Sequence, residues 1–152
     1  MTAQLELLAA HPLSEEALAM IGQSEAELSA LYRPEHRNAF SPQELVEADT
    51  RFIVAYDSGG PIGCGGMAPA LGYGELKRIF VTRAARGRGV AKAIVARLEA
   101  MARALDLPLM RLETGLASPE AIALYTRLGY RERGPFGAYV ENGSSVFMEK
   151  AL

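Results

Sequence analysis

The sequence predicts an α/β protein, with helices on the faces of a mixed, mostly antiparallel central sheet. Residues 51–56 alternate in hydrophobicity, and residues 61–68 return as a second strand after a turn, which is typical of a β-hairpin. At Val90 the apolar spacing changes from that of a strand to that of a helix. A further strand and helix follow over residues 109–128. This order indicates a β-meander followed by βαβ units, which together form an α/β sandwich.

The first 50 residues predict one short strand and three helices. Residues 4–8 favour the strand, and Ser14 is expected to cap the first helix. Residues 24–27 form the pattern Ser-Glu-Ala-Glu, a capping box that predicts the start of a second helix, which Pro34 ends. Ser41 begins another capping box with proline at the first helical position, which predicts the third helix.

The second half predicts a strand at residues 74–81 and a long amphipathic helix from Val90. One stripe of this helix holds Ile94, Leu98, Met101 and Leu105. Glu99 and Arg103 are expected on the opposite side, spaced as an ion pair. The remaining elements are strands at 109–114, 130–133 and 145–150 and a helix at 118–128.

Composition indicates a single domain, 1–152, with one core. A length of 152 residues with 49% hydrophobic and 22% charged residues is typical of a soluble globular protein. No apolar run approaches a membrane span, and we see no signal peptide, so we expect no membrane association and a cytoplasmic protein. Cys64 is the only cysteine, and a buried strand position is favoured over a reactive thiol. With two separated histidines besides, no transition-metal site is expected.

Charge is distributed unevenly although the net charge is only −2, which gives no reason to expect nucleic-acid binding. Residues 1–75 hold 11 acidic and 3 basic residues, a net charge of −8, whereas residues 76–152 hold 7 and 13, a net charge of +6. Two ordinary solvated surfaces would explain this. An anionic cofactor on the basic half and an amine substrate on the acidic half would explain it equally well.

The turn between the strand at 74–81 and the long helix favours a phosphate site. Backbone N–H groups at the start of a helix lack intrahelical partners and lie at the positive end of the helix dipole. Gly87 and Gly89 carry no side chain to obstruct a ligand, and Arg83, Arg86 and Arg88 add positive charge. The turn has neither the Gly-Lys-Ser/Thr ending of a P-loop nor the third glycine of a dinucleotide fingerprint. It therefore predicts a phosphate or pyrophosphate site of another kind.

Two motifs resemble those of the GNAT superfamily of N-acetyltransferases. Residues 86–91, Arg-Gly-Arg-Gly-Val-Ala, fit its pyrophosphate-binding pattern Gln/Arg-x-x-Gly-x-Gly/Ala. Residues 118–130, Ser-Pro-Glu-Ala-Ile-Ala-Leu-Tyr-Thr-Arg-Leu-Gly-Tyr, are similar to its second pattern, Asn-x-x-Ala-x-x-Leu-Tyr-x-x-x-Gly-Phe. The resemblance covers residues 74–152. It implies a GNAT-like sandwich whose central strands splay apart to admit coenzyme A.

The resemblance also implies which residues bind coenzyme A, the carrier of the acetyl group. Its arm would lie along the strand residues Ile79, Phe80 and Val81, and its diphosphate would meet the N–H groups of Arg86, Gly87, Arg88, Gly89, Val90 and Ala91. Ser118 stands where the family usually has the asparagine that contacts the arm, so that contact is in doubt while the helix cap is expected to remain. Tyr125 matches the family's tyrosine that acts as general acid toward the sulfur.

The general base is less well defined. Glu75 begins the cofactor strand, where some family members carry a catalytic glutamate, and alternation would place it on the same face as Ile79 and Val81. Glu113, on the neighbouring strand, could reach the same cleft. An ion pair with Lys77, Arg78 or Arg111 is the structural alternative for both. Glu75 is preferred, although many family members use no single base.

The acceptor side is the least defined. In the family, the early helical region forms one wall of the acceptor site, which would make Tyr32, His36, Arg37 and Phe40 lining residues. Packing is nevertheless the favoured interpretation for the two aromatic residues, and an exposed surface position for the other two. Residues 135–139, Pro-Phe-Gly-Ala-Tyr, would suit a flap over the acceptor, a dimer contact or a plain hairpin loop.

These patterns predict an enzyme that transfers an acetyl group from acetyl-CoA to a primary amine of a small molecule or amino acid. The transfer would occur by direct attack in a ternary complex. A protein N-terminus or lysine stays open as the acceptor, and a homodimer stays open as the assembly. The alternatives are a non-catalytic module that senses acyl-CoA and a nucleotide-phosphate binder of another family.

Overall fold

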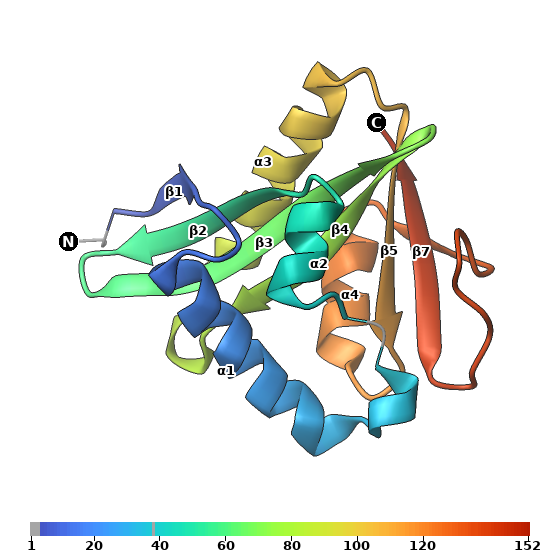
Figure 1. The fold of residues 1–152 in the computed structure, drawn as a ribbon, viewed down its shortest axis with the longest axis horizontal. Coiled ribbons are helices and arrows are strands. Elements are labelled where there is room, and N and C mark those ends of the chain that lie inside the picture. Colours follow the sequence, from blue (N-terminus) through green and yellow to red (C-terminus); the bar gives the residue numbers. More distant parts are fainter. Residues whose placement is uncertain (1–3, 38) are drawn as a thin grey trace.

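The computed structural model describes residues 4–37 and 39–152 (Figure 1). Within these residues, seven strands form one sheet in the order β1-β2-β3-β4-β5-β7-β6. Neighbouring strands are antiparallel except β4 and β5, which are parallel. The strands are β1 Glu6–Ala9, β2 Arg51–Asp57, β3 Gly60–Ala70, β4 Tyr73–Val81, β5 Leu109–Gly115, β6 Arg131–Arg133 and β7 Ser145–Ala151. The mixed, mostly antiparallel sheet is the one that the sequence predicts.

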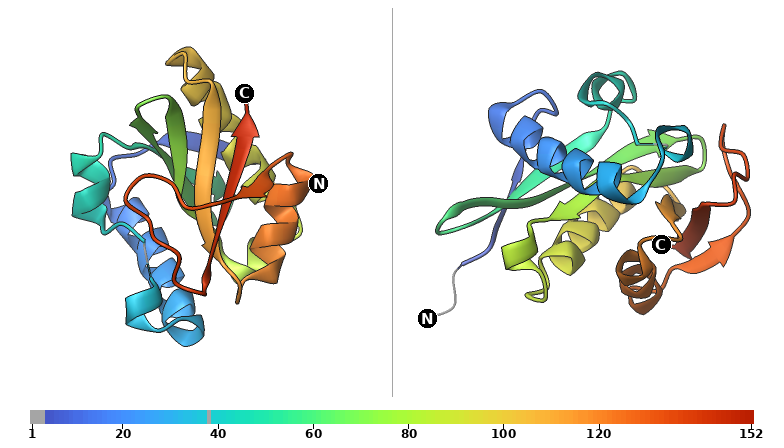
Figure 2. Two further views of the ribbon diagram at one scale, coloured as in Figure 1. Left: turned by 90° about the vertical axis from the view of Figure 1, so that its right-hand side faces the viewer. Right: turned by 90° about the horizontal axis from the view of Figure 1, so that it is seen from below.

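The helices form two layers, one on each face of the sheet (Figures 1 and 2). The α-helices are α1 Glu15–Leu31, α2 Pro42–Glu47, α3 Val90–Ala104 and α4 Pro119–Arg127, with short 3-10 helices at Pro34–His36 and Arg83–Ala85. Helices α1 and α2 cover one face, and α3 and α4 cover the other. None of the helices in the described part of the chain has the length and apolar content needed to cross a membrane.

Helix α1 is longer than the sequence indicates. Ser14 caps it, accepting a hydrogen bond from the Ala17 N–H at 3.3 Å. The predicted second helix start at Ser24 is wrong, because α1 continues through that residue and buries it. The sequence of a capping box does not by itself interrupt a helix that runs through it. A serine acts as an N-cap only where the backbone leaves the helical conformation. At Ser41 the backbone is extended, and the predicted capping box with Glu44 forms.

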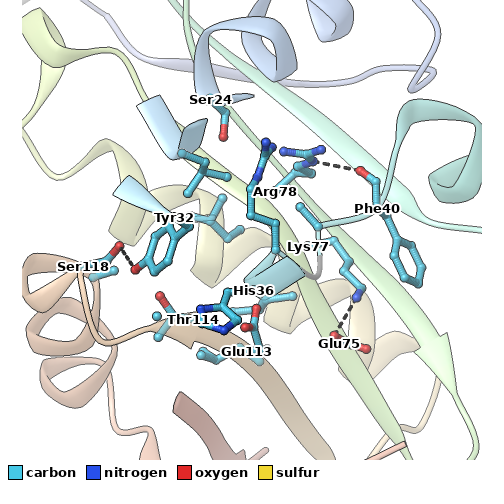
Figure 3. Close-up of a pocket in the computed structure, with 18 of the residues that line it drawn as sticks. Ser24, Tyr32, His36, Phe40, Glu75, Lys77, Arg78, Glu113, Thr114 and Ser118 are labelled. Atoms are coloured by element: carbon cyan, nitrogen blue, oxygen red, sulfur yellow. Dashed lines mark hydrogen bonds and ion pairs between the residues drawn. The ribbon is translucent and has the colours of Figure 1, made fainter. Parts of the chain in front are cut away.

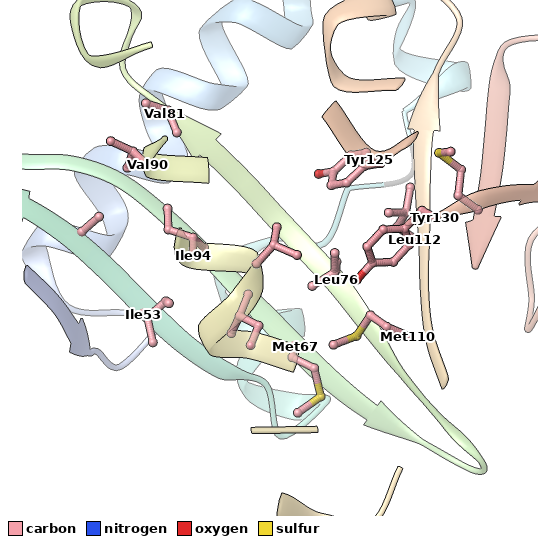
Figure 4. Close-up of a cluster of buried hydrophobic side chains, with 14 of the residues drawn as sticks. Ile53, Met67, Leu76, Val81, Val90, Ile94, Met110, Leu112, Tyr125 and Tyr130 are labelled. Carbon is pink, nitrogen blue, oxygen red and sulfur yellow. The ribbon is translucent and has the colours of Figure 1, made fainter. Parts of the chain in front are cut away.

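Helix α3 packs closely on β3 and β4, and glycines of β3 make this possible (Figure 4). A Cβ atom at Gly65 would lie 2.6 Å from the Ile79 side chain and 2.7 Å from Ile94 of α3. A Cβ at Gly63 would lie 2.8 Å from the carbonyl oxygen of Phe80. The glycines weaken β3 as an isolated strand, but they allow the close approach that the sequence suggested.

One charged residue of α3 lies in the core instead of on the solvent side. Glu99 is 5% exposed and accepts hydrogen bonds from the Tyr130 hydroxyl at 2.7 Å and from Lys150 Nζ at 3.0 Å. The ion pair predicted with Arg103 is therefore replaced by contacts with residues far along the chain. These contacts tie α3 to β7, and buried charges require such partners.

The sheet opens between its two parallel strands. Of the described residues, β4 and β5 pair only at Gly74 with Met110 and at Glu75 with Arg111. On its other edge β5 pairs with β7 along its whole length, from Leu109 to Gly115. The strands therefore diverge after Glu75, and Tyr125 of α4 lies beside the opening (Figure 4). This is the splay that the resemblance implied.

Candidate active site

Two connected hollows lie at the opening of the sheet. We call the larger one, about 910 Å³, the long groove; it runs from residues 83–92 along Ile79–Val81 to α4. We call the smaller one, about 200 Å³, the inner cavity; it lies between α1, β4 and β5. Six residues line both hollows: Ser24, Leu28, Ile79, Ser118, Ala121 and Tyr125. A molecule in the groove and a molecule in the cavity would therefore meet at these side chains.

The turn before α3 presents backbone groups to the long groove. Gly87 and Gly89 adopt φ values of 80° and 78°, in the left-handed region that glycine adopts without strain. No atom lies within 4 Å of the position that a Cβ would take at either residue. Gly89 is the N-cap of α3 and supplies no side-chain cap, so the first N–H groups of α3 are available to an anion.

The arginines of this turn are already paired with acidic residues of the N-terminal half. Arg86 binds Glu27 of α1 through Nη2 at 2.7 Å and donates from Nε to the Val81 carbonyl at 3.0 Å. Arg88 pairs with Asp57 at 3.1 Å. The hydrogen bonds that Asp57 accepts from the N–H of Gly59 and from Arg88 hold the pKa of its carboxyl group below the usual range. The uneven charge distribution of the sequence is thus partly neutralised across this turn.

Most residues that the sequence predicts for the cofactor meet along the long groove. Nine of them line it: Ile79, Phe80, Val81, Arg86, Gly87, Gly89, Val90, Ala91 and Ser118. Arg88 does not, because its side chain turns toward Asp57. Since β5 has diverged from β4 at this level, the exposed edge of β4 is free to accept an extended ligand as an added strand. The groove therefore fits coenzyme A.

A bulge in β4 changes which face each residue occupies. Arg78 has a φ of 57°, and the pairing of β3 with β4 shifts between Cys64 and Gly66. Leu76, Ile79 and Val81 consequently pack in the same core cluster beneath α3. Glu75 adjoins Leu76 and faces the other side, so the prediction that it shares a face with Ile79 and Val81 is wrong. Simple alternation fails because the bulge inserts one extra residue.

The inner cavity is lined by side chains from separate segments (Figure 3). Tyr32, His36, Arg37 and Phe40, for which packing or surface positions were favoured, all line it. Lining residues also come from β4, from β5 and from Tyr139 in the segment before β7. The early helical region therefore forms a wall of this cavity, as the resemblance implied, and residues 135–139 contribute to it through Tyr139.

Tyr125 lies at the junction of the two hollows. Its side chain is 7% exposed, and its ring packs edge-on against Tyr130 with a centroid separation of 5.8 Å. Burial raises the pKa of its phenol above the ordinary value. The group therefore keeps its proton at neutral pH and is available as a hydrogen-bond donor. It lies where a molecule in the groove and a molecule in the cavity would meet.

Ser118 precedes α4 but does not cap it through its side chain. The expected cap is absent, because the hydroxyl of Ser118 lies 2.6 Å from the hydroxyl of Tyr32. This hydrogen bond joins the end of α1 to the start of α4 (Figure 3). Tyr32 also requires Gly115, since a Cβ there would lie 2.1 Å from its hydroxyl oxygen. The pair thus lies at the inner cavity, beside the place where the groove meets it.

Both candidate bases line the inner cavity, and both have partners. Glu75 pairs with Lys77 at 2.7 Å and accepts a hydrogen bond from the Tyr139 hydroxyl. The ion pair that stood as the structural alternative for Glu75 is therefore formed. Glu113 accepts a hydrogen bond from Ser145 Oγ at 2.7 Å. Lys77 also lies over the Phe40 ring, 3.7 Å from its centroid, so these contacts link the segments that surround the cavity.

Sequence reasoning missed several lining residues. Lys77 and Arg78 were considered only as ion-pair partners, and Ser24 only as a helix cap, yet all three line the inner cavity. The exposed fractions of the Lys77 and Arg78 side chains are 5% and 4%. Two adjacent charged residues inside a predicted central strand were a usable signal, because charged side chains are rarely buried unless they have a partner.

The splayed sheet and its two meeting hollows define the class of acyl-CoA N-acyltransferases. A family model described as the acetyltransferase (GNAT) family matches residues 18–130. The chain therefore belongs to the GNAT family and is an N-acetyltransferase.

Relatives and solved structures agree with this assignment. An IAA acetyltransferase of Azospirillum brasilense is 41% identical over 143 residues, which cover 93% of this chain and 94% of the relative. A Klebsiella pneumoniae structure classed as an acyl-CoA N-acyltransferase superposes with a TM-score of 0.83 at 33% identity, covering 98% of both chains. The PaiA N-acetyltransferase of Thermoplasma acidophilum, solved in complex with coenzyme A, has a TM-score of 0.75 at 16% identity and covers all of both chains. At that identity, the last likeness concerns the fold alone.

Proposed function

We propose that this N-acetyltransferase transfers the acetyl group of acetyl-CoA to the primary amine of a small molecule or amino acid, by direct attack in a ternary complex. The observation that carries the proposal is the meeting of a long groove and a small cavity at one buried tyrosine. A cavity of about 200 Å³ supports a small acceptor, since sites for drug-sized ligands measure about 300–1,000 Å³.

Each role in the reaction has a candidate residue. Acetyl-CoA, when bound, supplies the acetyl group as a thioester. The edge of β4 at Ile79–Val81 would hold the arm, and the N–H groups at the start of α3 would bind the diphosphate. The amine nitrogen would bond to the carbonyl carbon, and Tyr125 would donate its proton to the sulfur as the carbon–sulfur bond breaks. The proton that the nitrogen loses as the amide forms would restore the Tyr125 phenol. Glu75 or Glu113, directly or through water, would accept the proton that the ammonium loses.

The test is calorimetric titration of the protein with acetyl-CoA, with ATP and NAD as controls. We expect saturable binding of acetyl-CoA alone, accompanied by a stabilisation of about 2.7 kcal/mol at a hundredfold excess over the Kd. A panel of small amines, followed by release of free thiol, then identifies acceptors. A well-folded sample that binds no acetyl-CoA, or binds ATP or NAD equally well, would contradict the proposal.

The two candidate bases can be separated in the same assay. Glu75→Gln and Glu113→Gln each keep the shape of the side chain and remove its charge. The variant that removes the base should lower kcat about a hundredfold or more and flatten the acid limb of the pH–rate profile. If both variants retain the wild-type profile, proton transfer occurs through water without either carboxylate.

A further inference from the structure

Two arginines in the wall of the inner cavity share a single carboxylate. Arg37 follows the first 3-10 helix, Arg78 lies at the bulge of β4, and both form ion pairs with Glu25 of α1. Arg37 also donates to Ser29 at 3.2 Å, and Arg78 donates from Nε to the Phe40 carbonyl at 2.9 Å. Glu44 also interacts electrostatically with Arg78, so the cluster holds two arginines and two carboxylates.

Each of these guanidinium groups also keeps one buried N–H without a partner. Among the described residues, Arg37 Nε and Arg78 Nη1 are buried and donate to no acceptor of the protein. The Arg78 side chain is only 4% exposed. A buried donor without an acceptor costs about 1–3 kcal/mol, and more when the group is charged. Native structures contain few such donors, and a ligand that supplies the acceptor is one reason for them.

Burial of the charged Arg78 guanidinium affects its pKa. Burial lowers the pKa of its guanidinium below the ordinary value. The group stays charged, because arginine does not lose its proton in proteins. An anion beside it would offset the lost hydration through charge-assisted hydrogen bonds, which are the strongest available to a planar guanidinium.

We propose that the inner cavity binds the carboxylate of an acceptor that also carries the reacting amine, with Arg78 and Arg37 as its partners. The inference rests on the proposed function and names its substrate class: a small amine with a carboxylate. Both guanidinium groups line the cavity, and each has one N–H donor left over for the oxygens of a carboxylate. Tyr32, Phe40 and Tyr139 line the same cavity, so the body of such an acceptor would contact aromatic surfaces (Figure 3).

The wild-type enzyme provides the first test. Acetylation of phenylalanine, leucine and alanine is compared with that of their amides, with rates expressed per concentration of unprotonated amine. We expect kcat/KM for the acids to exceed that for the amides by about tenfold or more, because a charge-assisted pair to a buried arginine is lost in the amide. Equal rates, or faster acetylation of the amides, would overturn the inference while leaving the proposed transfer reaction intact.

A variant pair tests the residue. Arg78→Met should reduce kcat/KM for the acids about tenfold, leave the amides unchanged and keep the affinity for acetyl-CoA. Arg97→Met is the matched control, since Arg97 is exposed on α3 at the opposite face of the sheet. Arg97→Met should change kcat/KM neither for the acids nor for the amides. If Arg78→Met does not fold, Arg37→Met replaces it with the same expected result.

A binding measurement separates this inference from the reaction. The protein, saturated with coenzyme A, is titrated with 3-phenylpropionate and with 3-phenylpropanamide, neither of which carries an amine. Tighter binding of the acid supports the arginine site even if no amine is acetylated, in which case only the proposed transfer fails. Equal binding of acid and amide, or no binding of the acid, overturns the carboxylate site whatever the turnover.

Discussion

The long groove and the inner cavity adjoin each other, but they are built in different ways. The end of the groove beside α3, where we propose that the diphosphate binds, comes from one continuous stretch, residues 86–91, whose glycines leave open space. The cavity consists of side chains from α1, β4, β5 and the segments beside them. The first is a local structure, whereas the second exists only after the chain has folded.

The charged residues of the groove and those of the cavity also differ, in how far they are buried. At the groove, the ion pair between Arg86 and Glu27 is about one-third exposed on both sides. In the cavity, the side chains of Lys77 and Arg78 are almost completely buried, while their partners Glu75 and Glu25 are 12% and 36% exposed. Exposed pairs contribute little and are screened by salt, while buried pairs are costly to disturb. We therefore expect the groove to tolerate charge substitutions that the cavity and the walls supporting it do not.

The largest expected effect is at the junction of the two hollows. Tyr125→Phe should lower kcat about a hundredfold or more while changing the Kd for acetyl-CoA less than about threefold, because it removes only the proton donor. Calorimetry and thiol release measure the two quantities. A loss of affinity as large as the loss of turnover would make Tyr125 a binding residue. Unchanged turnover would mean that another group or water, and not Tyr125, protonates the leaving thiolate.

Tyr130→Phe is the matched control for that variant, since it removes one buried hydroxyl beside Tyr125. The hydroxyl of Tyr130 donates to Glu99, so the variant should lose about 1–3 kcal/mol of stability. Its turnover below the melting temperature should stay near that of the wild type. Tyr125→Phe should therefore lose turnover, whereas Tyr130→Phe should lose stability.

The next effect concerns a cluster of ion pairs that joins β5, β6 and β7 beside the cavity. Glu149 of β7 binds Arg111 and Arg133, each at 2.7 Å, and Arg111 holds its pKa below the usual range. Glu149→Gln should cost about 1–2 kcal/mol at neutral pH. A lowered carboxyl pKa stabilises the fold above the unfolded-state pKa, and the contribution is lost as pH falls through the folded-state pKa. Thermal melts of variant and wild type should therefore converge below about pH 4; a constant difference would contradict this.

A change in backbone geometry at the groove should have a smaller effect, and we expect it in the affinity for acetyl-CoA. Gly89→Ala introduces a Cβ at a φ of 78° and disturbs the N–H groups at the start of α3, so we expect acetyl-CoA to bind about tenfold more weakly. Gly72→Ala is the control, with a φ of 85° in the turn between β3 and β4. Both variants should lose similar stability. Equal affinities in calorimetry would contradict a backbone-bound diphosphate.

The smallest effect tests whether the exposed charges at the groove matter. Glu27→Gln releases Arg86 and removes an acidic charge from the groove. At low salt, acetyl-CoA should bind about two- to fivefold more tightly, and the gain should vanish near 1 M salt because the charges are then screened. Glu15→Gln, at the other end of α1, is the control and should have no effect on binding. Weaker binding by the Glu27 variant would mean that Glu27 positions Arg86 for the cofactor.

The features that the sequence by itself determined depend on neighbouring residues. The strand, turn and helix at residues 75–105 follow from apolar spacing and glycine placement, and the caps at Ser14 and Ser41 follow from local hydrogen bonds. The prediction of a phosphate site at residues 86–91 could be made because the backbone N–H groups and the helix dipole come from one contiguous segment.

Tertiary structure decided the features that depend on contacts between distant segments. The bulge at Arg78 turned Glu75 away from Ile79, and the partners on β7 and after α4 drew Glu99 into the core. The lining of the cavity by Tyr32, Arg37 and Phe40 arises because α1 and the segments after it pack across β4 and β5. Such burial lowers the free energy only once the sheet exists, so the local pattern of these residues carries no trace of it.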